Sequence, residues 1–269
     1  MNVYLLELRN LRKSAALGAL FISAILLLML AFFPSMQTDA MKALANAELQ
    51  GIDPAILAVL GMSEMMDFSQ ITNFFGYIIQ FIMLIIIIIT TQHAMSILIK
   101  EETDGTIEFL GAKPISRAAI FTQKLLAHFT VFVFTMLVYI VTTTVGYLLF
   151  SDYSFAAALE EASIFFGAIF FVGTIFSSLG LLLSAFLRSS KGAAGITIAI
   201  VFGTFLLGIL SVLVKDLDFL IWVSPLDWIK AAKLMSKGIL WQEWIIGITC
   251  SIACICAAWL RYRKKDLLI

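Results

Sequence analysis

The longest charged stretch of the sequence runs from Lys100 to Lys124, between two apolar runs. Its acids and bases are Glu101, Glu102, Asp104, Glu108, Lys100, Lys113, Arg117 and Lys124. Such side chains fix the register of a protein contact, and the interleaved Ile107, Phe109 and Leu110 would fill a groove on a partner. We therefore expect this segment to contact another protein in water. The alternative is a charged hairpin that lies on lipid headgroups.

Other residue types that carry chemistry are sparse. The two histidines, His93 and His128, have no carboxylate beside them in the apolar runs, so we expect interfacial polar residues and no metal site. Serines and threonines there lack a base to activate them, which argues against nucleophilic catalysis. No ionisable residue falls well inside an apolar run, which argues against an ion-coupled transporter. The chain has no G-x-x-x-x-G-K-[ST] loop, so it does not hold ATP in that way.

Composition predicts an all-α membrane protein, whose helices must position these residues. Hydrophobic residues make up 61% of the 269 and charged residues only 13%, against about 25% charged in soluble domains. The formal net charge is zero, so nucleic acid is not expected as a partner. The three cysteines, Cys250, Cys254 and Cys256, lie in one apolar run and imply no disulfide framework.

Six apolar stretches are long enough to span a bilayer, which requires about 20 residues. They are residues 14–33, 71–99, 125–150, 162–187, 192–214 and 239–260. The first follows Arg9, Arg12 and Lys13 and is expected to be a retained anchor rather than a cleaved signal. The second exceeds the thickness of the hydrocarbon core, so we expect it to tilt or to project on the side of the charged segment.

An even number of spans places both termini on one side of the membrane. The side that holds the termini, the 100–124 segment and the 188–191 connection carries 13 of the 18 lysines and arginines. The positive-inside rule therefore predicts that both termini lie in the cytoplasm. We expect the membrane to be the plasma membrane.

The remaining segments belong to the same single domain, residues 1–269. Residues 1–13 are predicted to form an amphipathic interfacial helix, or alternatively the start of the first span. Residues 34–70 are expected to form an extracellular cap of short helices, with Asp53-Pro54 as one helix start. Residues 215–238 are predicted to be either re-entrant or a surface loop, and their tryptophans to be interface anchors.

Small residues mark one face of the fourth span. Gly173, Ser177, Gly180 and Ser184 lie within about 60° of one another at 100° per residue. A face of small residues lets helices approach closely, so we expect packing within the chain here rather than a dimer seam.

The charged segment divides into short pieces. Asp104-Gly105-Thr106 predicts a turn, Gly111 a helix end and Lys113-Pro114 a break. Ser116 is a suitable N-cap for the helix that enters the third span. A short amphipathic helix near 106–110 is thus expected between two long ones.

The run E-E-T-D-G-T-I-E-F-L-G-A-K-P-I-S-R, Glu101 to Arg117, resembles the signature of type-2 ABC transporter permeases. The resemblance implies a coupling segment that docks on a cytosolic ATPase. The implied contact residues are Glu101, Glu102, Gly105, Thr106, Glu108, Phe109, Leu110, Pro114 and Arg117. It further implies two ATPase copies, which bind the ATP and Mg²⁺, and a second permease copy or paralogue surrounded by membrane lipid.

The resemblance favours export of an amphipathic or hydrophobic substrate, such as a drug, peptide or lipid-like molecule, by a chain that is not itself an enzyme. One alternative is a membrane anchor or sensor subunit that binds an extracellular ligand and signals without transport. A membrane-embedded enzyme is disfavoured by the missing acid, base or metal set.

Overall fold

The structure is a computed structural model that describes residues 3–39, 67–105, 115–187 and 189–265. Its long helices are α1 (Val3–Ala31), α5 (Ile71–Ile97), α8 (Arg117–Phe150), α9 (Phe155–Phe186), α10 (Ala193–Leu213) and α13 (Trp241–Lys264). The short ones are α2 (Phe33–Met36), α6 (Lys100–Thr103), the 3₁₀ helix η1 (Lys215–Val223), α11 (Pro225–Trp228) and α12 (Ala231–Lys237). No strand occurs within these ranges.

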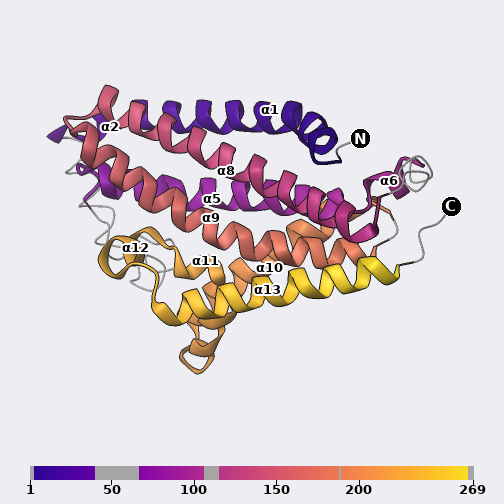
Figure 1. Cartoon of the computed structure of the whole chain (residues 1–269). Coiled ribbons are helices and arrows are strands. Elements are labelled where there is room, and N and C mark those ends of the chain that lie inside the picture. Colours follow the sequence, from indigo (N-terminus) through magenta and orange to yellow (C-terminus); the bar gives the residue numbers. More distant parts are fainter. Residues whose placement is uncertain (1–2, 40–66, 106–114, 188, 266–269) are drawn as a thin grey trace.

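The six long helices are each long and apolar enough to cross a membrane, which confirms an all-α membrane protein. They run side by side as a bundle, with the start of α1, the end of α13 and α6 at the same end (Figure 1). We call this end, with Glu7, α6, Arg117, Lys124 and Lys265, the charged end. The expectation that the second span is unusually long is not specific to it, because α8 has 34 residues and α5 has 27.

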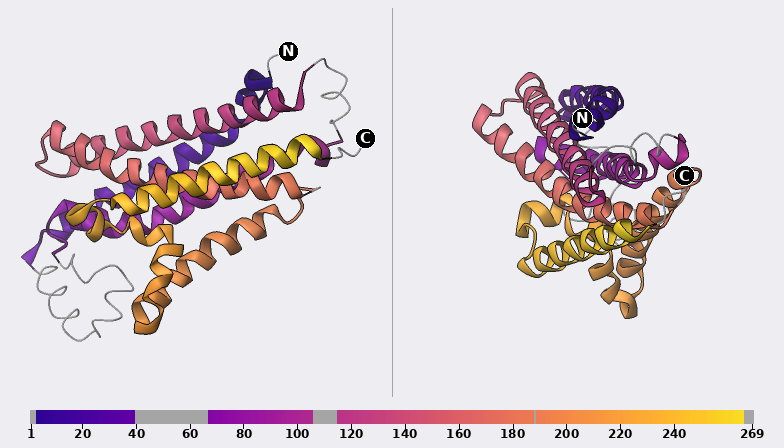
Figure 2. Two further views of the ribbon diagram at one scale, coloured as in Figure 1. Left: turned by 60° about the horizontal axis from the view of Figure 1, so that its bottom comes forward. Right: turned by 45° about the vertical axis from the view of Figure 1, so that its right-hand side comes forward.

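Helix α9 forms the centre of the bundle and packs against α5, α8 and α13, while α1 packs mainly on α8. Its aromatic residues Phe165 and Phe166 are buried, and Phe165 meets Phe75 of α5 edge-on, with ring centroids 5.3 Å apart. Helix α10 stands at the periphery and diverges from the bundle axis (Figure 2). The centre is therefore a tightly packed α5–α9 pair.

The four small residues predicted on one face of α9, Gly173, Ser177, Gly180 and Ser184, all lie buried. A Cβ at Gly180 would sit 2.9 Å from the carbonyl oxygen of Thr91, closer than real Cβ contacts, so the backbones of α5 and α9 touch there. At Gly173 a Cβ would meet the ring of Phe132 at 2.5 Å. Ser177 and Ser184 are fully buried.

Two helices start earlier than the apolar runs predict. The predicted cap is confirmed: the Ser116 hydroxyl accepts from the backbone N–H of Ala119 at 3.2 Å, so α8 begins at Arg117. Ser154 caps α9 in the same way. The earlier starts bring Lys124 and Glu161 into the helices and into the buried interior, where hydropathy alone did not place any charge.

The N-terminal residues do not form a separate helix, because α1 is continuous from Val3 to Ala31. Good helix formers such as Ala15 and Ala16 join the two parts, and no proline lies within α1. That residues 1–13 lie in the membrane interface stays a prediction.

The connecting segments are described in part. Residues 40–66, with the predicted helix start at Asp53-Pro54, lie outside the described residues. In the 215–238 segment the prediction that every tryptophan anchors to the interface is wrong for Trp228. Its side chain is buried and its indole N–H donates to the carbonyl of Ile221 at 2.9 Å. Trp222 is 42% exposed.

Candidate functional site: the charged end of the bundle

Helix α6 begins the charged segment just beyond the end of α5. It closes with the backbone N–H of Asp104 donating to the carbonyl of Lys100 at 2.8 Å. Gly105 follows with φ of 66°, a left-handed conformation that favours glycine after a helix. The remaining predicted contact residues lie outside the described residues: Thr106, Glu108, Phe109, Leu110 and Pro114.

Lys124 is the centre of the charged end. Its fully buried Nζ lies 2.7 Å from Oε1 of Glu7 and 2.5 Å from Oε1 of Glu101, and it donates to the carbonyl of Ile97 at 2.6 Å. A buried ammonium is costly unless its donors are satisfied, and three acceptors satisfy this one. One side chain thus joins α1, the α5–α6 junction and α8.

A second ion pair attaches the C-terminal end of α13. Lys265 Nζ lies 2.8 Å from Oε1 of Glu102 and donates to the carbonyl of Leu187 at 2.6 Å. The Glu102 carboxylate accepts no well-aligned hydrogen bond among the described residues, so this pairing is mainly one of charge. Arg117 donates to the carbonyl of Lys265 at 2.5 Å. These contacts connect α6, α8, α9 and α13.

A hydrogen bond connects α6 to the segment that leads into the peripheral helix α10. The backbone N–H of Ser190, in the connection between α9 and α10, donates to the Thr103 hydroxyl at 2.9 Å. Side chains of α6 therefore contact Lys124 of α8, Lys265 after α13 and the connection between α9 and α10. A displacement of α6 must move its neighbours or break these contacts.

The structure separates the predicted contact residues into two groups. Glu101 and Glu102 face inward and pair with lysines of the same chain, whereas Gly105 and Arg117 are exposed, as are Lys100 and Asp104. Two participants, Glu7 and Lys265, come from opposite ends of the chain and were not predicted as site residues. No local pattern pairs either one with residues 100–124.

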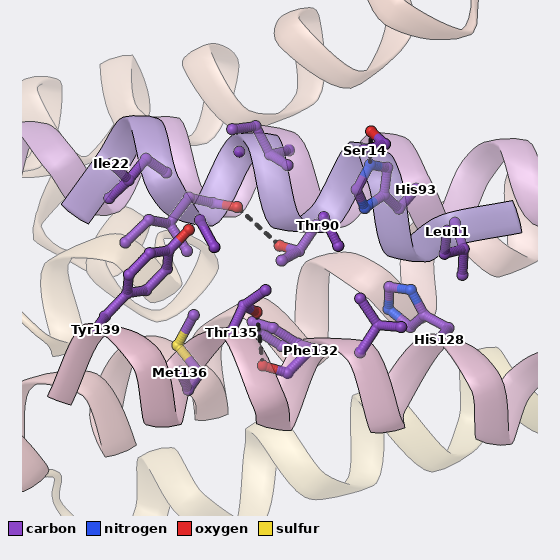
Figure 3. A pocket seen from close by; sticks show the side chains of 16 residues that line it. Leu11, Ser14, Ile22, Thr90, His93, His128, Phe132, Thr135, Met136 and Tyr139 are labelled. Carbon is purple, nitrogen blue, oxygen red and sulfur yellow. Dashed lines mark hydrogen bonds between the residues drawn. The ribbon is translucent and has the colours of Figure 1, made fainter. Parts of the chain in front are cut away.

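A small, mostly apolar pocket with a few polar side chains lies deeper in the bundle, between α1, α5 and α8 (Figure 3). His93 and His128 lie toward one end of it and Tyr139 toward the other (Figure 3). His128 is 3% exposed and its Nε2 has no hydrogen-bond partner within the described residues, so the prediction of an interfacial histidine is wrong here. The pocket measures about 30 Å³, room for one or two water molecules rather than a substrate.

No group of three or more metal-ligating side chains is close enough to hold an ion in the part of the chain that the structure describes. Among these described residues, the histidine pair has too few further ligands for a zinc site.

The opposite end of the bundle carries a different polar cluster, around Glu161 of α9. Its carboxylate accepts from the hydroxyls of Tyr147 at 2.6 Å, Thr72 at 2.8 Å and Tyr153 at 3.2 Å. Burial raises the pKa of Tyr153 above its ordinary value, which keeps the phenol a donor. This carboxylate is held by neutral groups and not by a cation.

Two ion pairs between residues close in sequence also lie at the end of the bundle that holds Glu161. Lys233 of α12 pairs with Glu243 of α13, whose other carboxylate oxygen accepts from the N–H of Leu240 at 2.9 Å. Asp227 pairs with Lys230, three residues later. Asp227 also fills the space over Gly208, where any larger residue would collide with its carboxylate.

Comparison with known proteins agrees with this architecture. The family model described as ABC-2 family transporter protein matches residues 1–267. No curated protein matches the chain. The match covers nearly the whole sequence and includes all six membrane-length helices, so the chain belongs to the ABC-2 transporter family, the membrane subunits of ABC transporters.

Proposed function

We propose that this membrane subunit works as an ATP-driven exporter, with two copies of a separate ATPase docked at its charged end. The observation that carries the proposal is the attachment of α6 to α1, α8 and α13 through Lys124 and Lys265. A partner that moves α6 would move three spans at once. The absence of a Walker loop from the sequence supports a separate source of ATP hydrolysis.

In this proposal the docking surface and the transmission elements are different residues. The exposed Lys100, Asp104 and Arg117, together with the predicted contact residues 106–114, would meet the ATPase. Glu101 and Glu102 would carry its movement inward through their ion pairs. We call the residues that would meet the ATPase the contact set, and Glu101 and Glu102 the transmission set.

The wider setting follows from the family and the composition. We infer a plasma-membrane complex with cytoplasmic termini, and a second permease copy or paralogue. The cargo is an amphipathic or hydrophobic molecule, supported by helices rich in phenylalanine, of which the chain has 23.

The test is to purify the full chain with its ATPase and to measure retained ATPase and ATP-dependent transport. Phe109→Asp should abolish retention if the 106–114 segment docks. Phe219→Asp is the matched control, because Phe219 is an exposed phenylalanine of η1, away from the charged end. Equal retention by both variants would overturn the docking assignment.

Transmission is tested separately. Glu101→Gln should keep the ATPase bound but reduce transport per ATP hydrolysed, since it removes one of the two carboxylates on Lys124. Unchanged coupling in this variant would exclude the transmission role while leaving docking intact. ATPase binding without any transport, for every cargo offered, would favour a sensor subunit instead.

A further inference from the structure

A groove of about 550 Å³ lies between the beginning of α1 and the first half of α8. Its α1 wall is one helical stripe, because its members fall within about 80° of Leu5 at 100° per residue: Leu5, Leu8, Arg9, Arg12, Ala15, Ala16 and Ala19. The outer rims are exposed apolar side chains, Leu5 at 59% and Phe134 at 65%. The groove therefore opens outward, where a membrane protein meets lipid.

Two arginines interrupt this mostly apolar stripe. Arg9 and Arg12 are exposed and lie about one turn apart on α1. No carboxylate of the described residues forms an ion pair with either one, and the acid closest to them on α1, Glu7, is committed to Lys124. Guanidinium groups beside lipid are costly unless an anion pairs with them. Phosphate matches the planar guanidinium fork, which binds two oxygens at once.

The groove beyond the arginines has the shape for a hydrocarbon chain. Ala15, Ala16 and Ala19 keep the α1 wall shallow, with Val131 and Phe134 of α8 opposite. From Arg12 to Ala19 the wall extends about 10 Å along the helix. A ligand that fits both parts carries a negative headgroup and a flexible apolar tail.

We propose that this groove is a binding site for an anionic glycerophospholipid. Its phosphate pairs with Arg9 and Arg12, and one acyl chain lies over Ala16 and Ala19 against Phe134. The bound lipid covers the exposed side of α1 and completes the α1–α8 contact. This site is independent of the ATPase and of the cargo.

The test uses the purified full chain in mixed micelles with phosphatidylglycerol, measuring retained lipid by native mass spectrometry and the thermal midpoint. Binding should saturate and raise the midpoint. Arg9→Gln and Arg12→Gln should each weaken binding at least about tenfold, as expected for losing hydrogen bonds to a charged group. Lys13→Gln is the matched control: it removes the same charge from the neighbouring position, which does not line the groove.

A second pair of variants tests the acyl site with all charges intact. Ala16→Leu fills the groove and should weaken binding, whereas Ala24→Leu changes an exposed alanine of α1 outside it and should not. The proposal is overturned if Lys13→Gln weakens binding as much as Arg12→Gln, since that indicates general charge attraction. It is equally overturned if inorganic phosphate raises the midpoint as much as the lipid. A lipid-independent dimer that Ala16→Leu disrupts would assign the groove to a second copy.

Discussion

The two ends of the bundle hold their buried carboxylates in opposite ways. At the charged end Glu7 and Glu101 share one lysine that comes from a third helix. At the opposite end Glu161 is held by three hydroxyl groups, and the ion pairs there are local in sequence. Ion pairs therefore connect helices distant in sequence at the charged end, whereas at the opposite end they join residues close in sequence.

This difference predicts where the loss of a charged or polar side chain should reduce the stability of the protein most. Removing Lys124 at the charged end leaves two carboxylates without their cation. This is costly, because an unpaired charge is poorly solvated in low-dielectric surroundings. Removing one hydroxyl at the opposite end leaves two others in place. Removing one side-chain group should therefore lower the free energy of unfolding more at the charged end than at the opposite end.

The largest effect is expected for Lys124→Met, which should lower the free energy of unfolding by about 3–5 kcal/mol. Thermal unfolding in detergent, followed by tryptophan fluorescence, measures it. Adding Glu7→Gln to Lys124→Met should recover part of the loss, since one buried charge is then neutralised. Additive losses in the double variant would contradict the shared-cation account.

Glu161→Ala should cost less, about 2–3 kcal/mol, because it strips acceptors from buried hydroxyls without leaving a buried charge. Tyr147→Phe removes one donor of the three and should cost about 1 kcal/mol. The same unfolding measurement applies. If Glu161→Ala lowers the free energy of unfolding more than Lys124→Met does, the proposed contrast between the two ends is wrong.

A smaller loss is expected for Lys233→Met, about 1 kcal/mol, because this lysine is partly exposed and Glu243 keeps its bond to the N–H of Leu240. It is the matched lysine substitution for Lys124→Met. A loss equal to that of Lys124→Met would show that pairing to distant helices confers no special sensitivity.

The smallest effect is expected for Lys100→Ala, within about 0.5 kcal/mol of the unchanged protein, because the side chain is exposed. The same variant should weaken ATPase retention if Lys100 belongs to the docking surface. A large loss of stability with unchanged retention would move Lys100 from the contact set to the transmission set.

Much of the fold was predictable because hydropathy responds to burial in lipid. All six spans were located this way, and the Ser116 cap followed from local backbone chemistry. The burial of Lys124 and Glu161 was not predicted, because their partners are supplied by tertiary contacts that no window along the chain contains. For the same reason the pairing of Glu7 with residue 124, or of Lys265 with Glu102, had no local signal. Trp228 was misassigned because its depth depends on how η1 and α11 fold back.

The contact between Gly180 and Thr91 also has a mechanical consequence. Since the backbones of α5 and α9 touch at that point, it is a natural fulcrum for α5. The arm from Thr91 to Ile97, where α5 ends, is about 9 Å long, and the arm from Thr91 to Ile71 is about 30 Å, at 1.5 Å per residue. If α5 tilts as a rigid rod, a displacement of its Ile97 end is roughly tripled and reversed in direction at its Ile71 end.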